Sequence, residues 1–406
     1  MSGPGPFGSG GDEPVPGFGL FGDLARMLQG QGGFQWDQAR AMALQLATGG
    51  TSEANVDPLE RIKLEQLARV AELHVGQATG LSTSTTGRPV TVVPVTRAQW
   101  VQGSTDAYRP LFEKLAASLA AQAAAAASDP ADPLDDGPSD PMGAFLEHLV
   151  GAAAPMLLSL MAGSLLGHLA RRSFGQYDLP VPRPASDELV LVAPNLAEFG
   201  EAWSLQHDDL LLWVCIHEIT HHAVLGLPHV RHALDELLAE YAAGFTTQGG
   251  GLDERLGELS LDDPSSLVEL QQRFSDPEVL LGAIRSDAQR HLLPRLEALV
   301  AVIVGYVDWV MDTVGSSLIG GYAQLTEALR RRRVEADASD RFVEQLLGLQ
   351  LTQGAYDRGT SFIAGVVERA GAEGLERLWA GADVLPTPAE VDAPGLWLAR
   401  IDLPTD

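Results

Sequence analysis

Two histidines and a glutamate lie within five consecutive residues, in the HEITH segment that runs from His217 to His221. Residues i and i+4 of an α-helix lie one turn apart on the same face, so both imidazoles can bind one metal ion. Glu218 lies beside the first histidine, where its carboxylate can accept a proton from metal-bound water. The spacing therefore predicts a site for one Zn²⁺, with His217 and His221 as ligands and Glu218 as general base for the hydrolysis of a peptide or amide.

A third protein ligand is needed to complete such a zinc site, and two carboxylates are candidates. Glu240 follows His221 after eighteen intervening residues, a separation typical of zincins whose third ligand is a glutamate on the next helix. Asp308 lies in an otherwise apolar helical pattern, where a lone carboxylate is costly without a partner or a metal. The alternatives are an exposed Glu240 and an Asp308 that hydrogen-bonds a ligand histidine. The residues alone leave this choice open.

The HEITH segment lies in a predicted helix over about residues 206–225. Ser204 is the expected N-cap, and Gly226 and Pro228 are the stop signals. The residues directly around the two histidines are uncharged, as a buried helix that holds an active site requires.

Two short strands are predicted among long helices. The β-branched segment Val90–Val95, with Pro94 at an edge position, and the segment Leu189–Ala193 are the strands. Apolar spacing indicates helices over residues 58–80, 143–172, 230–247, 294–314, 321–333, 340–350 and 357–380. We therefore predict a mostly α, or α+β, fold with a small sheet.

Composition divides the chain into four parts. Residues 1–35 are predicted to be a flexible Gly/Pro-rich tail, 36–119 a helix and strand region that packs on the core, 120–141 an acidic Ala/Pro linker, and 142–406 the helical core. Within that core, residues 149–170 carry no Asp, Glu, Lys or Arg and are long enough to span a bilayer. Their many small residues favour a buried helix over a transmembrane one.

The chain is strongly acidic, with 54 Asp and Glu against 27 Lys and Arg and a net charge of −27. Phosphate contacts dominate nucleic-acid affinity, so this charge argues against a nucleic-acid partner, and it disfavours anionic membranes. Cys215 is the only cysteine, which excludes an internal disulfide. Together with an N-terminal segment that lacks the features of a secretory signal, it predicts a cytoplasmic protein. The partner expected from the HEITH site is a peptide or protein substrate.

The sequence resembles an actinobacterial zincin-like metallopeptidase family, sometimes labelled as associated with deazaflavin-coenzyme biosynthesis. The resemblance is carried by WVCIHEITHH at 213–222, GYVDWVMD at 305–312 and the ending LPTP at 385–388, and it extends from about Phe34 to the C-terminus. It implies a mostly α, zincin-like α+β fold and a zinc peptidase in which His217 and His221 hold the metal and Glu218 is the general base.

One position departs from that family pattern. Members read Glu-Gly-x-x-Asp where this chain has Val304 and, four residues later, Asp308. The resemblance places the glutamate on zinc and the aspartate on a ligand histidine, and valine cannot ligate. Either Asp308 moves onto the metal, or Glu240 supplies the ligand, or the site is weakened; the place of the helix favours Asp308. The competing functions are a degenerate zincin scaffold or binding protein without turnover, and a membrane-embedded metalloprotease.

Overall fold

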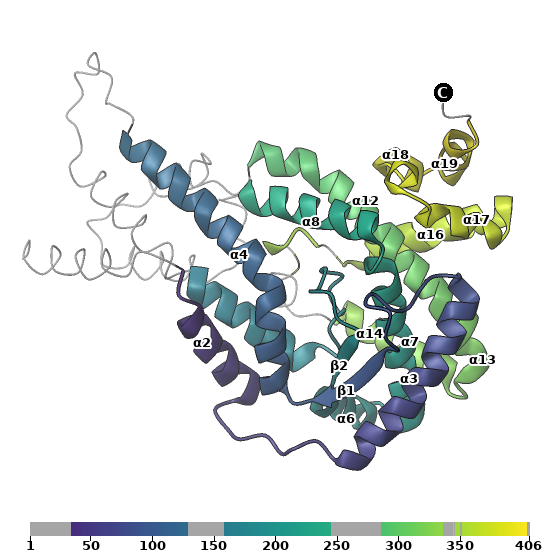
Figure 1. Ribbon diagram of the computed structural model, residues 1–406, viewed down its shortest axis with the longest axis horizontal. Helices are drawn as coiled ribbons and strands as arrows, with labels where there is room; N and C mark the ends of the chain where they lie inside the picture. The colour runs from purple at the N-terminus through teal and green to yellow at the C-terminus, as the bar shows by residue number, and fades with distance from the viewer. Residues whose placement is uncertain are drawn as a thin grey trace, which may run out of the picture.

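The structure is a computed structural model that describes residues 34–128, 158–244, 286–335, 344, 346–349 and 351–403 (Figure 1). The elements in chain order are α2 (Trp36–Thr48), α3 (Pro58–Thr79), β1 (Thr91–Val95), α4 (Arg97–Ser128), a helix over 158–172, β2 (Glu188–Val192), α6 (Ala193–Ala202), α7 (His207–Leu225), α8 (Pro228–Ala243), α12 (Asp287–Val310), the π-helical turn η1 (Met311–Gly315), α13 (Ser316–Leu318), α14 (Tyr322–Val334), α16 (Gln353–Ala370), α17 (Glu373–Glu376), η2 (Arg377–Trp379), η3 (Ala382–Val384), α18 (Pro388–Val391) and α19 (Pro394–Ile401). The mostly helical prediction is confirmed.

The two predicted strands form a parallel pair. Thr91 lies opposite Glu188 and Val95 lies opposite Val192. In each strand the second, fourth and fifth residues are buried. In a two-stranded sheet both strands are edge strands, which accommodates Pro94 because its missing N–H has no partner to lose. Buried residues from both sides of the predicted linker contribute to one hydrophobic core.

Helix ends follow local signals in some places and tertiary contacts in others. The Asp57 side chain caps α3 by accepting a hydrogen bond from the Leu59 amide at 2.9 Å, as its place before Pro58 predicts. The predicted cap at Ser204 is wrong: this residue has a positive φ of 52°, and α7 begins three residues later without a side-chain cap. Ser204 lies in the tight turn that precedes the helix, where its backbone amide donates a hydrogen bond to the Glu201 carbonyl oxygen.

Helix α4 extends to Ser128, into the range 120–141 that was assigned to the linker. The remaining linker residues, and nearly all of the predicted tail, lie outside the described part of the chain. Most residues of the predicted 340–350 helix also lie outside the described part of the chain. The predicted 357–380 helix is interrupted at Gly371, whose φ of +69° ends α16.

The described part of the apolar 149–170 segment packs against α2. A Cβ on Gly163 would lie 2.6 Å from the Ala39 carbonyl oxygen, and one on Gly167 would lie 2.6 Å from the Leu46 Cβ. Among the described residues, Asp287–Leu318 is the one single helix with the length and hydropathy of a membrane span, and 78% of its apolar window is buried in the protein. The α7–α8 pair passes the same test only as a span bent by 87°.

Helices α12 and α16 cross with their backbones in contact at Gly305 and Gly359. A Cβ on Gly359 would overlap the carbonyl oxygen of Ala301, an atom that cannot move without breaking α12. Because α12 carries Asp308 and packs on α7, this crossing fixes one wall of the candidate site.

We therefore expect Gly359→Ala to lower the free energy of unfolding by about 3 kcal/mol, the upper range for overpacking. Gly103→Ala in α4 is the control, since no atom lies within 4 Å of its new Cβ, and it should gain about 0.5–1 kcal/mol from helix propensity. Urea unfolding of both variants measures the difference. Equal stabilities would contradict this close crossing.

Candidate metal centre

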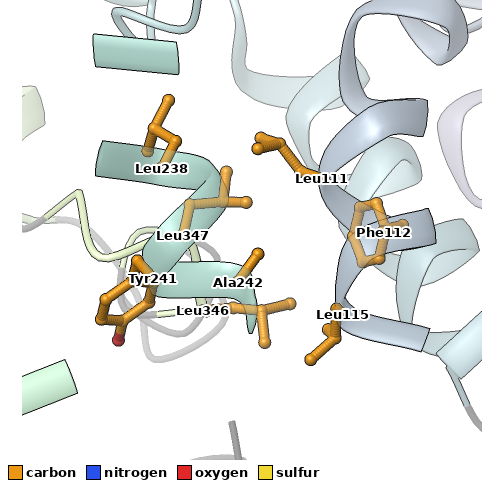
Figure 2. A pocket seen from close by; sticks show the side chains of 8 residues that line it. All are labelled: Leu111, Phe112, Leu115, Leu238, Tyr241, Ala242, Leu346 and Leu347. Carbon is orange, nitrogen blue, oxygen red and sulfur yellow. The ribbon is translucent and has the colours of Figure 1, made fainter. Parts of the chain in front are cut away.

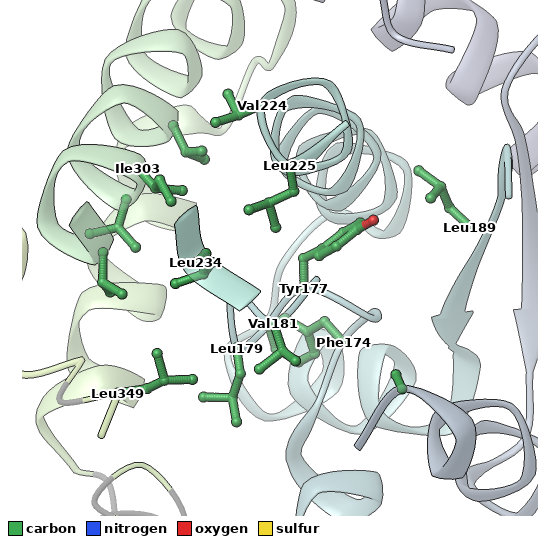
Figure 3. Packing of buried hydrophobic residues seen from close by; sticks show 14 of the residues in the cluster. Phe174, Tyr177, Leu179, Val181, Leu189, Val224, Leu225, Leu234, Ile303 and Leu349 are labelled. Atoms are coloured by element: carbon green, nitrogen blue, oxygen red, sulfur yellow. The ribbon is translucent and has the colours of Figure 1, made fainter. Parts of the chain in front are cut away.

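Helix α7 carries the HEITH segment through the interior of the protein. Fifteen of its nineteen residues are buried, and it contacts α3, α12, α8 and β2. Figure 3 shows Val224 and Leu225 of α7 on the side of Ile303 of α12, with Tyr177 beside Leu225 and Leu189 of β2 across the helix. The apolar flanks of the motif thus hold the helix rigidly in the core.

The two histidines of the motif lie on the same face, as their spacing predicts. The His217 and His221 ring centroids are 4.4 Å apart. The His221 Nδ1 lies 3.1 Å from the His217 carbonyl oxygen, and the His217 Nδ1 lies 3.3 Å from Oε1 of Glu218. A carbonyl oxygen can only accept, so Nδ1 of His221 donates to it and Nε2 of His221 keeps the lone pair that a metal requires. The tautomer of His217 that donates from Nδ1 to Glu218 leaves its Nε2 in the same state.

Burial also keeps His221 neutral. Desolvation lowers the pKa of its imidazole well below the usual range, and the neighbouring His217 and Arg333 lower it further. Metal ligation needs the neutral ring, so His221 is prepared to bind a cation without first releasing a proton. A neutral His221 is compatible with metal ligation.

Glu218 is fully buried and bound to a loop of the chain. Its Oε2 accepts hydrogen bonds from the backbone amides of Gln176 at 2.8 Å and Tyr177 at 3.0 Å. A Cβ on Gly175 would overlap the Glu218 carboxylate, so only glycine fits there. The loop fixes Oε2 and leaves Oε1 directed to His217.

A chain of buried hydrogen bonds supports the other side of the site. The Tyr177 hydroxyl lies 3.0 Å from Nδ1 of His222, whose Nε2 lies 3.3 Å from Oδ1 of Asp187. Asp187 also accepts hydrogen bonds from the amides and hydroxyls of Thr85 and Thr86. Burial raises the pKa of Asp187, but these hydrogen bonds outweigh it and hold the pKa far below the usual value, so the carboxylate is ionised.

This chain positions the Tyr177 ring, which stacks on His221 with centroids 6.0 Å apart. Sequence analysis assigned no role to Tyr177 or Asp187. Neither lies in a recognisable motif, and the amides that bind Glu218 are backbone groups without any sequence signal.

Asp308 lies near the histidines but is paired with an arginine. Its two carboxylate oxygens lie 3.5 Å from the two Nη atoms of Arg333, whose guanidinium stacks 4.1 Å from the Tyr356 ring centroid. Burial raises the pKa of Asp308, while Arg333 and His217 lower it, which places the carboxylate within electrostatic reach of the first histidine. A carboxylate–arginine fork at 3.5 Å is looser than the usual 2.7–2.9 Å of charge-assisted hydrogen bonds.

The other positions considered for the third ligand do not join this cluster. Glu240 is exposed on α8, and Val304 is buried one helical turn before Asp308. Within the described part of the chain, no three His, Cys, Asp or Glu side chains converge closely enough to hold a metal ion. The structure thus places His217, Glu218 and His221 on one helix, pairs Asp308 with Arg333, and leaves Glu240 exposed on α8.

Two hollows elsewhere in the protein do not contain the motif. Figure 2 shows the first, an apolar cavity of about 10 Å³ between α4 and α8, which is too small for a substrate. The second is an open groove of about 680 Å³ between α16 and the α18–α19 segment, lined by residues that include Arg358, Glu368 and Asp392.

Comparison with known proteins gives one family and one structure. The sequence model of the zincin-like metallopeptidases matches residues 34–398 of this chain. The crystal structure "of a putative hydrolase with a novel fold from Chloroflexus aurantiacus" aligns with a TM-score of 0.63 and 24% identity, over 92% of this chain and 100% of that chain. At this identity the likeness concerns the fold. No protein of curated function matches the chain.

Proposed function

Because the chain belongs to the zincin-like metallopeptidase family, we propose that it is a zinc-dependent peptidase with the HEITH segment as its active site. The observation that carries the proposal is the state of the two histidines. Both Nδ1 atoms face acceptors, which leaves the Nε2 atoms of His217 and His221 for one Zn²⁺. This donor chemistry fits two of the three protein ligands of a catalytic zinc.

Zinc bound there would lower the pKa of a water ligand toward neutrality and polarise the substrate carbonyl. Glu218 then acts as general base through Oε1, because the Gln176 and Tyr177 amides hold Oε2. The same Oε1 accepts from the His217 Nδ1–H, so the glutamate also orients that ring. Tyr177 keeps the His221 ring in place from its other side.

For the third ligand we propose Asp308, with Glu240 as the alternative. Asp308 is half-buried, and burial raises its pKa while the charges of Arg333 and His217 lower it, whereas Glu240 is exposed on α8. Both carboxylate oxygens of Asp308 face the Arg333 guanidinium. For Asp308 to bind the metal, at least one of these oxygens must turn away from Arg333. Peptides or proteins are the proposed substrates, and the single, buried Cys215 supports a cytoplasmic setting.

Metal removal tests this function. We expect the purified protein to contain one zinc ion per chain, to lose peptide hydrolysis after chelation and to recover it when zinc is restored. Magnesium is the control ion, because it prefers an all-oxygen octahedral site. Hydrolysis that persists in metal-free protein would contradict the proposal.

A second candidate function is a zincin-fold binding or scaffold protein without turnover. Val304 and the Asp308–Arg333 pair favour it, because valine cannot ligate a metal and the Asp308 carboxylate is already paired with an arginine. This candidate requires that protein loaded with zinc hydrolyses no peptide from a mixed library. Zinc-dependent cleavage in the same assay would exclude it.

A further inference from the structure

Four apolar side chains lie exposed on the outer face of α3. The exposed fractions are 71% for Leu59, 54% for Ile62, 40% for Val70 and 58% for Leu73. The other exposed large apolar residues of the described chain are scattered over later segments. Figure 1 shows α3 near the outer edge of the molecule, and the exposed fractions of the four side chains show that the described elements leave them largely uncovered. Such a contiguous apolar stripe is typical of an interaction surface.

The opposite face of α3 already supports the fold. Leu64, Ala68, Ala71 and Val75 are buried, and α3 packs closely on α7 and on β1. A surface helix needs only one apolar face to pack on the core. The four exposed apolar residues of the outer face are therefore not required for the packing of α3 on the core.

The stripe is symmetric about the exposed residue Gln66. Leu59 and Leu73 lie seven residues before and after it, and Ile62 and Val70 lie four residues before and after it. Since a helix turns about 100° per residue, these five side chains fall within about 80° of its circumference. A helix packed antiparallel on a copy of itself brings Ile62 against the partner's Val70 and Leu59 against the partner's Leu73, which is the self-complementarity that a two-fold interface demands.

Charge on α3 fits the same arrangement. The chain as a whole has a net charge of −27, whereas α3 carries three acidic residues and three basic ones, so its net charge is zero. Two acidic molecules can approach here with little repulsion. Glu65 and Arg69 are both exposed beside the stripe. In the antiparallel arrangement Arg69 lies about 3 Å along the axis from the partner's Glu65, within reach of an ion pair, and symmetry makes this contact twice.

We propose that the outer face of α3 is the interface of a homodimer, in which two copies pack antiparallel about a two-fold axis that passes beside Gln66. A polar residue at the centre of an apolar helix seam fixes the register, because the paired amides can hydrogen-bond only when they meet. A single pair of helices buries less than the roughly 1,600 Å² of a standard interface, so this dimer is weak and forms with a micromolar dissociation constant. It does not depend on metal binding or on hydrolysis.

Sedimentation velocity over a dilution series of the full chain tests the proposal. We expect wild type to shift from monomer to dimer with concentration, and Ile62→Glu to remain monomeric at every concentration. Leu396→Glu is the matched control, because Leu396 is 59% exposed on α19, away from the stripe, and this variant should dimerise as wild type does. Wild type that stays monomeric, as it would if another part of its own chain covers the stripe, overturns the proposal.

A cysteine scan tests the antiparallel register. Cys215 is the only native cysteine and is buried, so an introduced thiol on α3 is the only accessible one. Oxidation of Gln66→Cys should give a covalent dimer, because the two positions meet at the axis. Gln77→Cys on the same face should not, since the antiparallel partners of that residue are separated by about 33 Å. Equal cross-linking of both variants would indicate a parallel or random contact and would refute this register.

A charge exchange tests the ion pairs. Glu65→Arg and Arg69→Glu should each weaken the dimer by about threefold to tenfold, because like charges then face each other across the axis. The double variant restores opposite charges and should recover most of the wild-type affinity. Double-variant affinity no better than either single variant would count against the proposed pairing.

Discussion

Glu218→Gln is expected to lower the rate of peptide hydrolysis by a factor of about 10² to 10⁴ while the protein stays folded. The amide oxygen of glutamine can still accept the hydrogen bonds from the Gln176 and Tyr177 amides, so the loop remains bound. The amide cannot take up a proton, and the group beside His217 becomes a donor in place of an acceptor. Initial rates on a fluorogenic peptide, together with the melting temperature and zinc content, measure these effects.

Glu236→Gln is the matched control for this loss. It makes the same chemical change on the exposed face of α8, so both activity and stability should match wild type. Glu218→Ala separates the two roles of the buried glutamate. It leaves two buried amides unpaired and should lower the free energy of unfolding by about 2–4 kcal/mol as well as abolish hydrolysis. Full activity in the glutamine variant would remove Glu218 from the mechanism.

Asp308→Asn is expected to weaken zinc binding by more than about 100-fold, beyond the 10–100-fold that loss of an outer-sphere carboxylate costs. The charge is lost while the size of the side chain is kept, and asparagine is a poor ligand for zinc compared with carboxylate. Competition with a chromophoric chelator measures the zinc dissociation constant directly, without any reference to turnover. His221→Ala should show a loss at least as large, since it removes a ligand of the proposed pair.

The same competition assay with Glu240→Gln decides between the two candidates for the third ligand. We expect wild-type affinity, because the structure leaves Glu240 exposed on α8. A large loss in this variant, with Asp308→Asn unchanged, would reverse the assignment. A change below about 100-fold in Asp308→Asn would place the carboxylate on a ligand histidine instead of on zinc.

Much of the fold follows from local sequence patterns. Asp57 and Pro58 begin α3, Gly226 and Pro228 follow the end of α7, and both strands lie within a residue of their predicted limits. These signals act through contacts between residues a few positions apart, so no tertiary information is needed. Ser204 was misjudged because its conformation is set by a turn between two packed helices.

The sequence by itself determined the pair of histidines with Glu218 between them, because the helical repeat alone places residues four apart on one face. Only the tertiary structure decided the surroundings of that pair. Backbone amides of the loop after Gly175 hold Glu218, and Arg333, from a helix much later in the chain, pairs with Asp308. Amides carry no side-chain signal, and a contact between distant segments depends on how α7, α12 and α14 pack, which no local pattern encodes.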